Sequence, residues 1–169
     1  IFFDEVRIPA EYMVVGSDAY GAVVEQILTG ANASMGTIFV GVGRAALEHA
    51  VEYAKTRVQG GVPIIQHQSV KARLFKMFVQ VEAARSLSRR VAHYNATNPP
   101  LIQYSIASKV NSTNTAFEVA SQAIQIFGGN GLTRDFPVEK LMRDAKLLQI
   151  YEGTSQIQRV VIARNMLGR

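Results

Sequence analysis

The sequence contains no cysteine among its 169 residues. This absence excludes disulfide bonds, thiolate metal sites and cysteine nucleophiles. The sequence also lacks any apolar run of about 18 residues, the length at which a membrane-spanning helix becomes a candidate. Its first residues show neither the basic segment nor the cleavage site of a secretory signal. We therefore expect a soluble protein without a membrane span, in a reducing compartment such as the bacterial cytoplasm or the mitochondrial matrix.

Charged residues are few, at 18%, against 48% hydrophobic residues, which is typical of a globular chain long enough for one well-cored domain. The net charge of +5 would suit an anionic partner. However, the basic residues stand singly or in pairs such as Arg89-Arg90, without interleaved aromatics, so we expect no nucleic-acid binding. A phosphorylated or CoA-like anion accounts better for the excess charge. Because the chain begins at Ile1 without an initiator Met, we expect it to be a piece of a longer protein.

Several common catalytic patterns are also missing. The three histidines, His49, His67 and His93, do not have the spacing of metal ligands, so we expect no metal site. No Gly-x-Ser-x-Gly nucleophile elbow occurs. The string Gly41-x-Gly43-x-x-Ala46 matches a dinucleotide-binding pattern, but it lies within a helical pattern rather than after a strand, so we do not interpret it as such a site.

Apolar residues that recur every three or four positions predict long amphipathic helices. The predicted helices cover about residues 21–57, 70–95, 106–124, 135–150 and 154 to the C-terminus. Short linkers between such helices favour an all-α fold, an up-and-down bundle of long helices. A short β-prone segment, residues 2–8, precedes them and is closed by Pro9.

N-cap residues indicate where the last two predicted helices begin. Asp135 is a plausible N-cap for the fourth helix, with Pro137 in its first turn. The fifth helix is expected to start at Thr154 or Ser155, where Ser155 and Gln158 have the spacing of a capping box.

Glu152 lies between these two helices, in a neutral run of apolar, glycine and hydroxyl residues. A carboxylate at such a junction is a candidate general base, because partial desolvation would make it a stronger base. The alternative is a solvated charge at the end of a helix, which describes most surface carboxylates.

Two further segments combine polar side chains with bare backbone. Residues 57–68 join the first two helices and supply a guanidinium, several amides and an imidazole, groups that can hold phosphate or a polar heterocycle. Residues 125–131 read Gln-Ile-Phe-Gly-Gly-Asn-Gly and offer an amide beside exposed backbone. The alternative for this second segment is a glycine C-cap that only ends the helix.

Taken together, these segments resemble the acyl-CoA dehydrogenase family over essentially all 169 residues. The matching motifs, in order, are residues 3–9, 57–68, 125–131, 137–146 (Pro-Val-Glu-Lys-Leu-Met-Arg-Asp-Ala-Lys) and 149–156 (Gln-Ile-Tyr-Glu-Gly-Thr-Ser-Gln). The resemblance implies that residues 1–18 are the end of a middle β-domain with its linker, and that residues 19–169 form the C-terminal helical-bundle domain.

The resemblance also implies a function. It is the FAD-dependent α,β-dehydrogenation of an acyl-CoA thioester in fatty acid metabolism. Glu152 would abstract the α-proton, its backbone N–H would help to stabilise the enolate-like charge, and the flavin would accept the β-hydride. Electrons would pass to an electron-transfer flavoprotein, and the protein would be a homo-oligomer, a dimer or tetramer.

Carried over by position, the resemblance assigns Glu152 as the catalytic residue and gives the following residues a contact with FAD or with the acyl and thioester groups. The residues expected to contact FAD are Arg57, Gln59, His67, Gln68, Gln125, Gly129, Thr154 and Gln156. Those expected to contact the substrate are Tyr151 and Gly153. Arg57 would face the pyrophosphate of a neighbouring subunit's cofactor, and Gln125 and Gly129 its adenosine end across the dimer interface.

Three positions depart from the family pattern. Gly60 stands where many members have an aromatic residue, and Thr29 and Asn32 stand where many have an Asp and an Arg that hold CoA. The departures at Thr29 and Asn32 leave open an unusual acyl-CoA or a non-CoA substrate. Separate alternatives for the function are an acyl-CoA oxidase, or a non-catalytic oligomerisation and cofactor-docking module when the chain is isolated. The presence of Glu152 argues against a flavin monooxygenase, which needs no such base.

Overall fold

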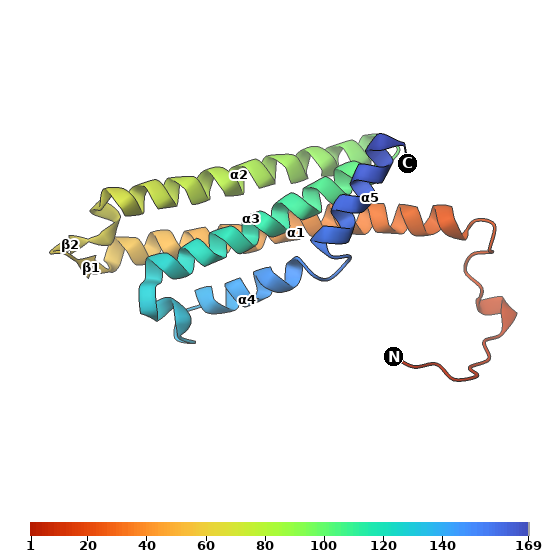
Figure 1. Ribbon diagram of the computed structural model, residues 1–169, viewed down its shortest axis with the longest axis horizontal. Helices are drawn as coiled ribbons and strands as arrows, with labels where there is room; N and C mark the ends of the chain where they lie inside the picture. The colour runs from red at the N-terminus through yellow and green to blue at the C-terminus, as the bar shows by residue number, and fades with distance from the viewer. Residues whose placement is uncertain (169) are drawn as a thin grey trace.

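A computed structural model describes residues 1–168 and confirms the predicted bundle of long helices (Figure 1). It also shows a two-stranded hairpin that the sequence analysis did not predict. The long helices are α1 (Tyr20–Thr56), α2 (Gln68–Thr97) and α3 (Ile102–Phe127), followed by the shorter α4 (Val138–Leu148) and α5 (Ser155–Leu167). Strands β1 (Val58–Gln59) and β2 (Val62–Pro63) pair antiparallel, and the short 3-10 helices are η1 (Ala10–Tyr12), η2 (Ile64–Gln66) and η3 (Gly128–Leu132).

The first four helices alternate in direction along the long axis of the molecule, as an up-and-down bundle requires (Figure 1). Helix α3 is the central element, since it contacts α1, α2, α4 and α5. Helix α5 lies across the end of the bundle where α2 finishes and α3 begins (Figure 1). Among residues 1–168, no helix combines the length and apolarity needed to cross a membrane.

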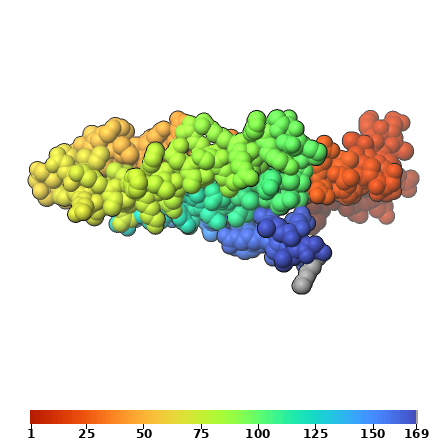
Figure 2. Space-filling model, turned by 90° about the horizontal axis from the view of Figure 1, so that it is seen from above, coloured from red at the N-terminus to blue at the C-terminus, as the bar shows by residue number. Residues whose placement is uncertain are grey.

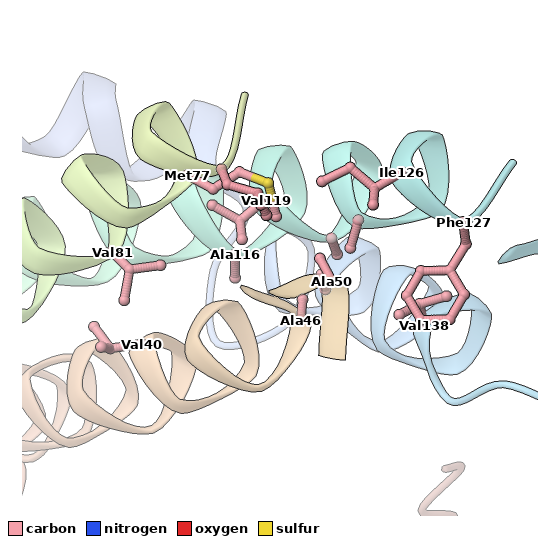
Figure 3. Close-up of a cluster of buried hydrophobic side chains, with 14 of the residues drawn as sticks. Val40, Ala46, Ala50, Met77, Val81, Ala116, Val119, Ile126, Phe127 and Val138 are labelled. Carbon is pink, nitrogen blue, oxygen red and sulfur yellow. The ribbon is translucent and has the colours of Figure 1, made fainter. Parts of the chain in front are cut away.

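Small side chains form much of the contact between α1 and α3. Ala46 and Ala50 of α1 and Ala116 of α3 are completely buried, beside larger residues such as Met77 and Val119 (Figure 3). An alanine adds little bulk between two helices, so their backbones approach closely and the larger side chains fill the remaining space. The helical periodicity read from the sequence therefore corresponds to a packed core.

Gly36 lies at a tight contact between α1 and α3. A methyl group added there would overlap the hydroxyl oxygen of Ser108 and lie 3.2 Å from the backbone nitrogen of Lys109. Gly41, one and a half turns later on α1, faces open space. The two glycines thus share a helix but differ in what surrounds them.

This difference predicts opposite effects for one substitution. Gly36→Ala is expected to destabilise the protein by about 1–3 kcal/mol, because the added methyl overpacks the α1–α3 contact. Gly41→Ala is the matched control and should be stabilising by up to about 1 kcal/mol, since alanine is the better helix former. Denaturant unfolding of the two full-length variants measures both, and equal midpoints would contradict the assigned contact.

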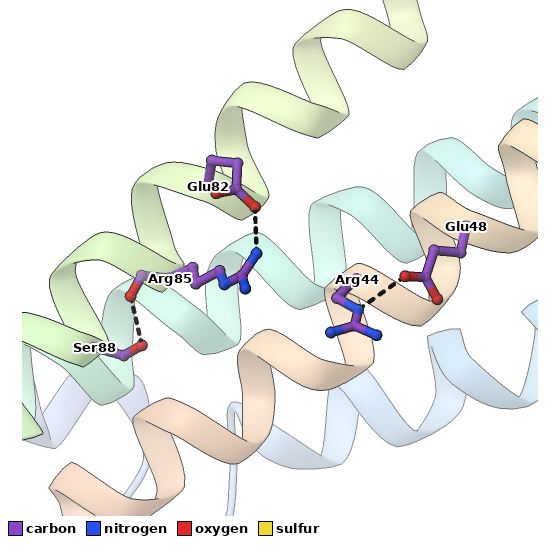
Figure 4. Close-up of polar contacts among 5 residues, drawn as sticks. All are labelled: Arg44, Glu48, Glu82, Arg85 and Ser88. Carbon is purple, nitrogen blue, oxygen red and sulfur yellow. Dashed lines mark hydrogen bonds and ion pairs between the residues drawn. The ribbon is translucent and has the colours of Figure 1, made fainter.

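Ion pairs on the outer faces of α1 and α2 connect residues one turn apart (Figure 4). Arg44 Nε lies 2.8 Å from a Glu48 carboxylate oxygen, and Arg85 Nη1 lies 3.1 Å from a Glu82 oxygen. Both pairs are solvent-exposed or nearly so, and such pairs contribute little to stability. The burial of apolar side chains is therefore the main source of stability for the bundle.

The predicted element ends need three corrections. Residues 2–8 form no strand, because a strand needs a hydrogen-bonded partner and residues 1–168 provide none there. Helix α4 begins at Val138, with Pro137 as its N-cap and not Asp135, since the first helical bond runs from Leu141 N to Pro137 O. Helix α5 has no Ser155–Gln158 capping box. Thr154 is its N-cap, and its hydroxyl oxygen accepts a hydrogen bond from Ile157 N.

Candidate active site

The loop between α4 and α5 carries Glu152 and has an unusual backbone. Glu152 has a φ of 56° and Gly153 a φ of 87°. The left-handed region is disfavoured for a residue with a Cβ, and non-glycine residues held there often lie at functional sites. Ser155 N donates to Gln149 O at 3.0 Å, and this hydrogen bond joins the two ends of the loop.

Two buried side chains hold the carbonyl groups of this loop. The ammonium of Lys109, on α3, donates to Tyr151 O at 3.0 Å and to Gly153 O at 2.7 Å. The side-chain amide of Gln158, on α5, donates to Glu152 O at 2.9 Å and to Asn32 Oδ1 at 2.6 Å. Three successive carbonyls thus have side-chain partners from two different helices.

Tyr151 joins the loop to the core. Its ring packs edge-on against Phe39, with ring centroids 5.7 Å apart, and its hydroxyl donates to Met35 Sδ at 3.4 Å. Burial raises the pKa of the Tyr151 hydroxyl, and the negative charge of Glu152 adds to the rise. The phenol is therefore a neutral, packed anchor for the residue that precedes Glu152.

Glu152 itself is exposed in this chain. The desolvation that the sequence led us to expect is therefore not provided by residues 1–168, because no side chain of this region covers the carboxylate. Thr154 and Gln156 are also exposed, at the N-terminal end of α5. The loop thus presents its polar groups outward while its carbonyls face buried donors.

The second predicted cluster lies at the β1–β2 hairpin. Arg57, Gln59 and Gly129 line one cavity of about 250 Å³ with Tyr53 and Asn130. Asn130 Nδ2 donates to the Tyr53 hydroxyl at 2.9 Å, and the Tyr53 ring stacks on Phe127 with centroids 4.0 Å apart. Tyr53 and Asn130 were not among the predicted site residues, although Asn130 lies within the motif of residues 125–131.

The other predicted residues of this cluster lie outside that cavity. His67 contacts the backbone of the hairpin, with Nε2 3.0 Å from Gln59 O, and Gln68 is the first residue of α2. Gln125 is exposed on the last turn of α3, and Gly128 caps this helix with a φ of 63°. A glycine therefore ends the helix, as the C-cap alternative predicted, but the segment also lines the cavity through the neighbouring Gly129.

The two clusters lie far apart along the bundle. In Figure 1 the hairpin is at one end of the long axis, whereas the α4–α5 loop lies well toward the other end. The space-filling view preserves this separation, with the hairpin residues in yellow at one tip and the α5 residues in blue beyond the middle (Figure 2). The structure therefore does not bring the predicted cofactor residues into one site within a single chain.

Thr29 and Asn32 occupy the α1 positions where the family resemblance led us to look for CoA contacts. Both are buried, with 3% of each residue exposed. Thr29 Oγ1 donates to Glu25 O at 2.7 Å, and Asn32 Nδ2 donates to Leu28 O at 2.8 Å. Their polar groups thus serve the helix and Gln158. Within residues 1–168, no group of three or more acidic or histidine side chains could hold a metal ion.

Around the Glu152 loop, the sequence analysis assigned no site role to Lys109 or Gln158. Lys109 is one turn from Ile106 and Thr113 on the buried face of α3, where a lysine is unusual. The sequence could have indicated Lys109 through this position, because a single charge on the buried face of an amphipathic helix needs a buried partner.

Comparison with known proteins agrees with this fold. Residues 21–167 match the family model described as acyl-CoA dehydrogenase, C-terminal domain. The chain is 41% identical over 169 residues to the probable acyl-CoA dehydrogenase fadE25 of Mycobacterium leprae, covering 99% of this chain and 43% of that protein. It is 38% identical over 173 residues to the acyl-CoA dehydrogenase of Bacillus subtilis, covering 99% of this chain and 44% of the relative.

Solved structures give the same picture. The butyryl-CoA dehydrogenase of Megasphaera elsdenii superposes with a TM-score of 0.92 at 36% identity, over 98% of this chain and 43% of that chain. A chain of the structure described as the electron transferring flavoprotein of Acidaminococcus fermentans also has a TM-score of 0.92, at 33% identity, over 99% of this chain and 44% of that one. The chain spans less than half the length of the relatives it matches.

Proposed function

The chain belongs to the acyl-CoA dehydrogenase family, as its C-terminal domain, and we propose that it is the helical part of an FAD-dependent enzyme that introduces an α,β double bond into an acyl-CoA thioester. The observation that carries the proposal is the α4–α5 loop. It holds Glu152 outward on a left-handed backbone fixed by buried donors.

In this proposal Glu152 is the general base that takes the α-proton of the thioester. Its carboxylate is exposed in this chain, so a substrate can reach it. A positioned base contributes about 10²- to 10⁴-fold to such a step. Tyr151 and Gly153 flank the base and would line the acyl and thioester pocket, and the Glu152 backbone N–H would stabilise charge on the thioester oxygen.

The residues of both clusters have the chemistry needed to hold FAD, which when bound supplies the redox step by accepting the β-hydride. Arg57 lines a cavity of about 250 Å³, and its guanidinium is suited to a pyrophosphate. Thr154 and Gln156 lie at the N-terminal end of α5, where backbone N–H groups favour an anion. His67, Gln68 and Gln125 lie near the hairpin end and would complete the contacts there.

The distance between the clusters supports an assembly of several subunits. The β1–β2 hairpin lies at one end of the bundle and the start of α5 lies beyond its middle (Figure 1). In this proposal Thr154 and Gln156 contact the flavin of their own subunit, and Arg57 and Gly129 contact another flavin. We therefore assign the hairpin cluster to the cofactor of a neighbouring subunit, in a homodimer or homotetramer. The hydrogen bond from Asn130 to the Tyr53 hydroxyl would shape that half of the site.

The N-terminal residues support a division of the whole protein into domains. Phe2 and Phe3 are 101% and 80% exposed, which is unusual for phenylalanine. We propose that residues 1–18 are the end of a middle β-domain with its linker, and that residues 19–169 form the helical domain. Of these, Arg169 lies outside the described residues. The relatives named above are bacterial, which favours the cytoplasm over the mitochondrial matrix, and an electron-transfer flavoprotein is the proposed electron acceptor.

Exposure of Glu152 and of the N-terminal phenylalanines also favours a more limited role for the isolated chain. Without the rest of the protein to cover the loop and complete the flavin site, the chain alone would be a docking and oligomerisation module. The whole protein, in which those surfaces are covered, would be the catalytic form.

The direct test is anaerobic mixing of the full-length flavoprotein with a panel of acyl-CoAs of different chain length and branching. At least one member should bleach the visible flavin absorbance within the time of normal turnover. A protein that retains its flavin but is bleached by no member of the panel would contradict the proposal. Rapid recolouring of the reduced enzyme by oxygen would identify an oxidase, whereas recolouring by electron-transfer flavoprotein alone would identify a dehydrogenase.

A further inference from the structure

Lys109 is a fully buried lysine that forms no ion pair within hydrogen-bonding distance among residues 1–168. Its exposed fraction is 0%, and its ammonium donates to two backbone carbonyls, Tyr151 O and Gly153 O. Burying an ammonium carries a large desolvation cost, which neutral carbonyls repay only in part. A methionine of similar length would fill the same space without that cost. The charge at this position therefore suggests a role other than packing.

The partners of Lys109 define that role. Tyr151 and Gly153 are the two neighbours of Glu152 in the chain, and the carbonyl between them, Glu152 O, accepts from Gln158 Nε2 at 2.9 Å. Gln158 is itself buried, at 4% exposed, and is tied to α1 through Asn32 Oδ1. The backbone on both sides of the carboxylate is thus fastened to α1, α3 and α5.

This fastening acts on a disfavoured conformation. Glu152 has a φ of 56°, and such a backbone persists only where its surroundings over-determine it. The loop is otherwise connected to the bundle through Tyr151, whose ring packs on Phe39, and through Gln149, whose Nε2 donates to Asn114 Oδ1 of α3 at 3.0 Å. Neither contact reaches the backbone of Glu152 or Gly153, and the remaining connections are short turns at the helix ends. Without the donors, the loop could relax to ordinary backbone angles and turn the Glu152 carboxylate to another direction.

The charge of Glu152 acts on Lys109 across the loop. Burial lowers the pKa of its ammonium, and the negative charge of Glu152 partly offsets that decrease. The carboxylate and the ammonium therefore interact electrostatically through the loop, although they are not hydrogen-bonded partners. The two charges lie on opposite sides of the same short segment, with the ammonium inside and the carboxylate outside.

We infer that Lys109 and Gln158 are positioning residues, which clamp the three carbonyls of residues 151–153 and so fix the direction in which Glu152 presents its carboxylate to the substrate. The inference rests on the proposed role of Glu152 as the base. It adds that the orientation of the Glu152 carboxylate depends on a buried ammonium group and a buried amide, both from helices outside the loop. Neither side chain needs to touch the substrate or the flavin.

The test uses Lys109→Met in the full-length protein, with Lys76→Met as the matched control because Lys76 is an exposed lysine on α2. The rate constant for anaerobic flavin reduction at saturating acyl-CoA, counted per bound flavin, should fall about tenfold to a hundredfold, as misplacement of a catalytic group by about 1 Å does. Substrate affinity and the visible spectrum of the bound flavin should be unchanged, and Lys76→Met should match the parent. A merely structural lysine would lower flavin content or stability and leave the rate per flavin at the parent value, and that result would overturn the inference.

A second variant decides the matter if Lys109→Met does not fold. Gln158→Leu removes one of the three carbonyl contacts, and the same rate should fall about threefold to tenfold. An unchanged rate per flavin in that variant would overturn the inference. Glu152→Gln separates this inference from the proposed function. If it retains the full rate, the base assignment is wrong, whereas a slow Glu152→Gln beside a fully active Lys109→Met contradicts the clamp alone.

Discussion

Replacing Glu152 by glutamine in the full-length protein is expected to slow anaerobic flavin reduction by acyl-CoA about 10²- to 10⁴-fold. Glutamine keeps the size of the side chain and can form hydrogen bonds, but it cannot accept the α-proton. Because the clamped carbonyls belong to the backbone, the loop contacts from Lys109 and Gln158 should remain in the variant. The effect should therefore appear in the chemical step and not in substrate affinity.

A matched control makes this result specific. Glu48→Gln introduces the same change on the exposed face of α1, where Glu48 pairs with Arg44. It should reduce the flavin at the parent rate, because exposed ion pairs of this kind contribute little. Stopped-flow absorbance of the flavin measures both variants. Reduction of the Glu152→Gln enzyme at the parent rate would show that another group accepts the proton.

The largest stability effect is expected for Phe39→Ala, which should lower the free energy of unfolding by about 3–5 kcal/mol. Phe39 is completely buried in the core between α1 and its neighbours and packs edge-on against Tyr151. The substitution removes apolar surface and leaves a cavity under the residue that anchors the Glu152 loop. We therefore expect the flavin-reduction rate of the folded variant to fall as well.

Ile38→Ala is the control for this substitution. Ile38 is the preceding residue on the same helix and is 57% exposed, so removing its side chain creates no enclosed cavity. Ile38→Ala should lower the free energy of unfolding by less than about 1 kcal/mol, since substitutions of exposed residues usually have small effects. Urea unfolding followed by the helical circular dichroism signal of the full-length variants measures both. Similar midpoints for the two variants would contradict the core position of Phe39.

The sequence predicted the helices well because their apolar spacing is a local property. Helix α1 was predicted over residues 21–57 and runs from Tyr20 to Thr56. The predicted ends of α4 and α5 were less accurate. Asp135 and the Ser155–Gln158 pair had the right spacing for caps, but Pro137 and Thr154 are the N-caps, and Gln158 turns inward to Asn32 and Glu152. A buried amide with two acceptors available there is not free to cap its own helix.

The candidate site was predictable in part. The position of Glu152 at a helix junction, and its resemblance to a family motif, followed from the residues around it. The exposure of its carboxylate did not, because burial depends on which segments cover a loop, and residues 1–168 leave it open. The partners of Lys109 were equally hidden, since they lie 42 and 44 residues away in the chain.

The sequence by itself determined the all-α class, the order and approximate length of the helices, and a short loop that isolates one glutamate between two of them. These features depend on periodicity and on residues close together in the chain. Only the tertiary structure decided that Glu152 is held on a left-handed backbone by a buried lysine and a buried glutamine, and that the hairpin cluster lies far from it. Such contacts join residues distant in sequence, and they form only when α1, α3 and α5 pack together.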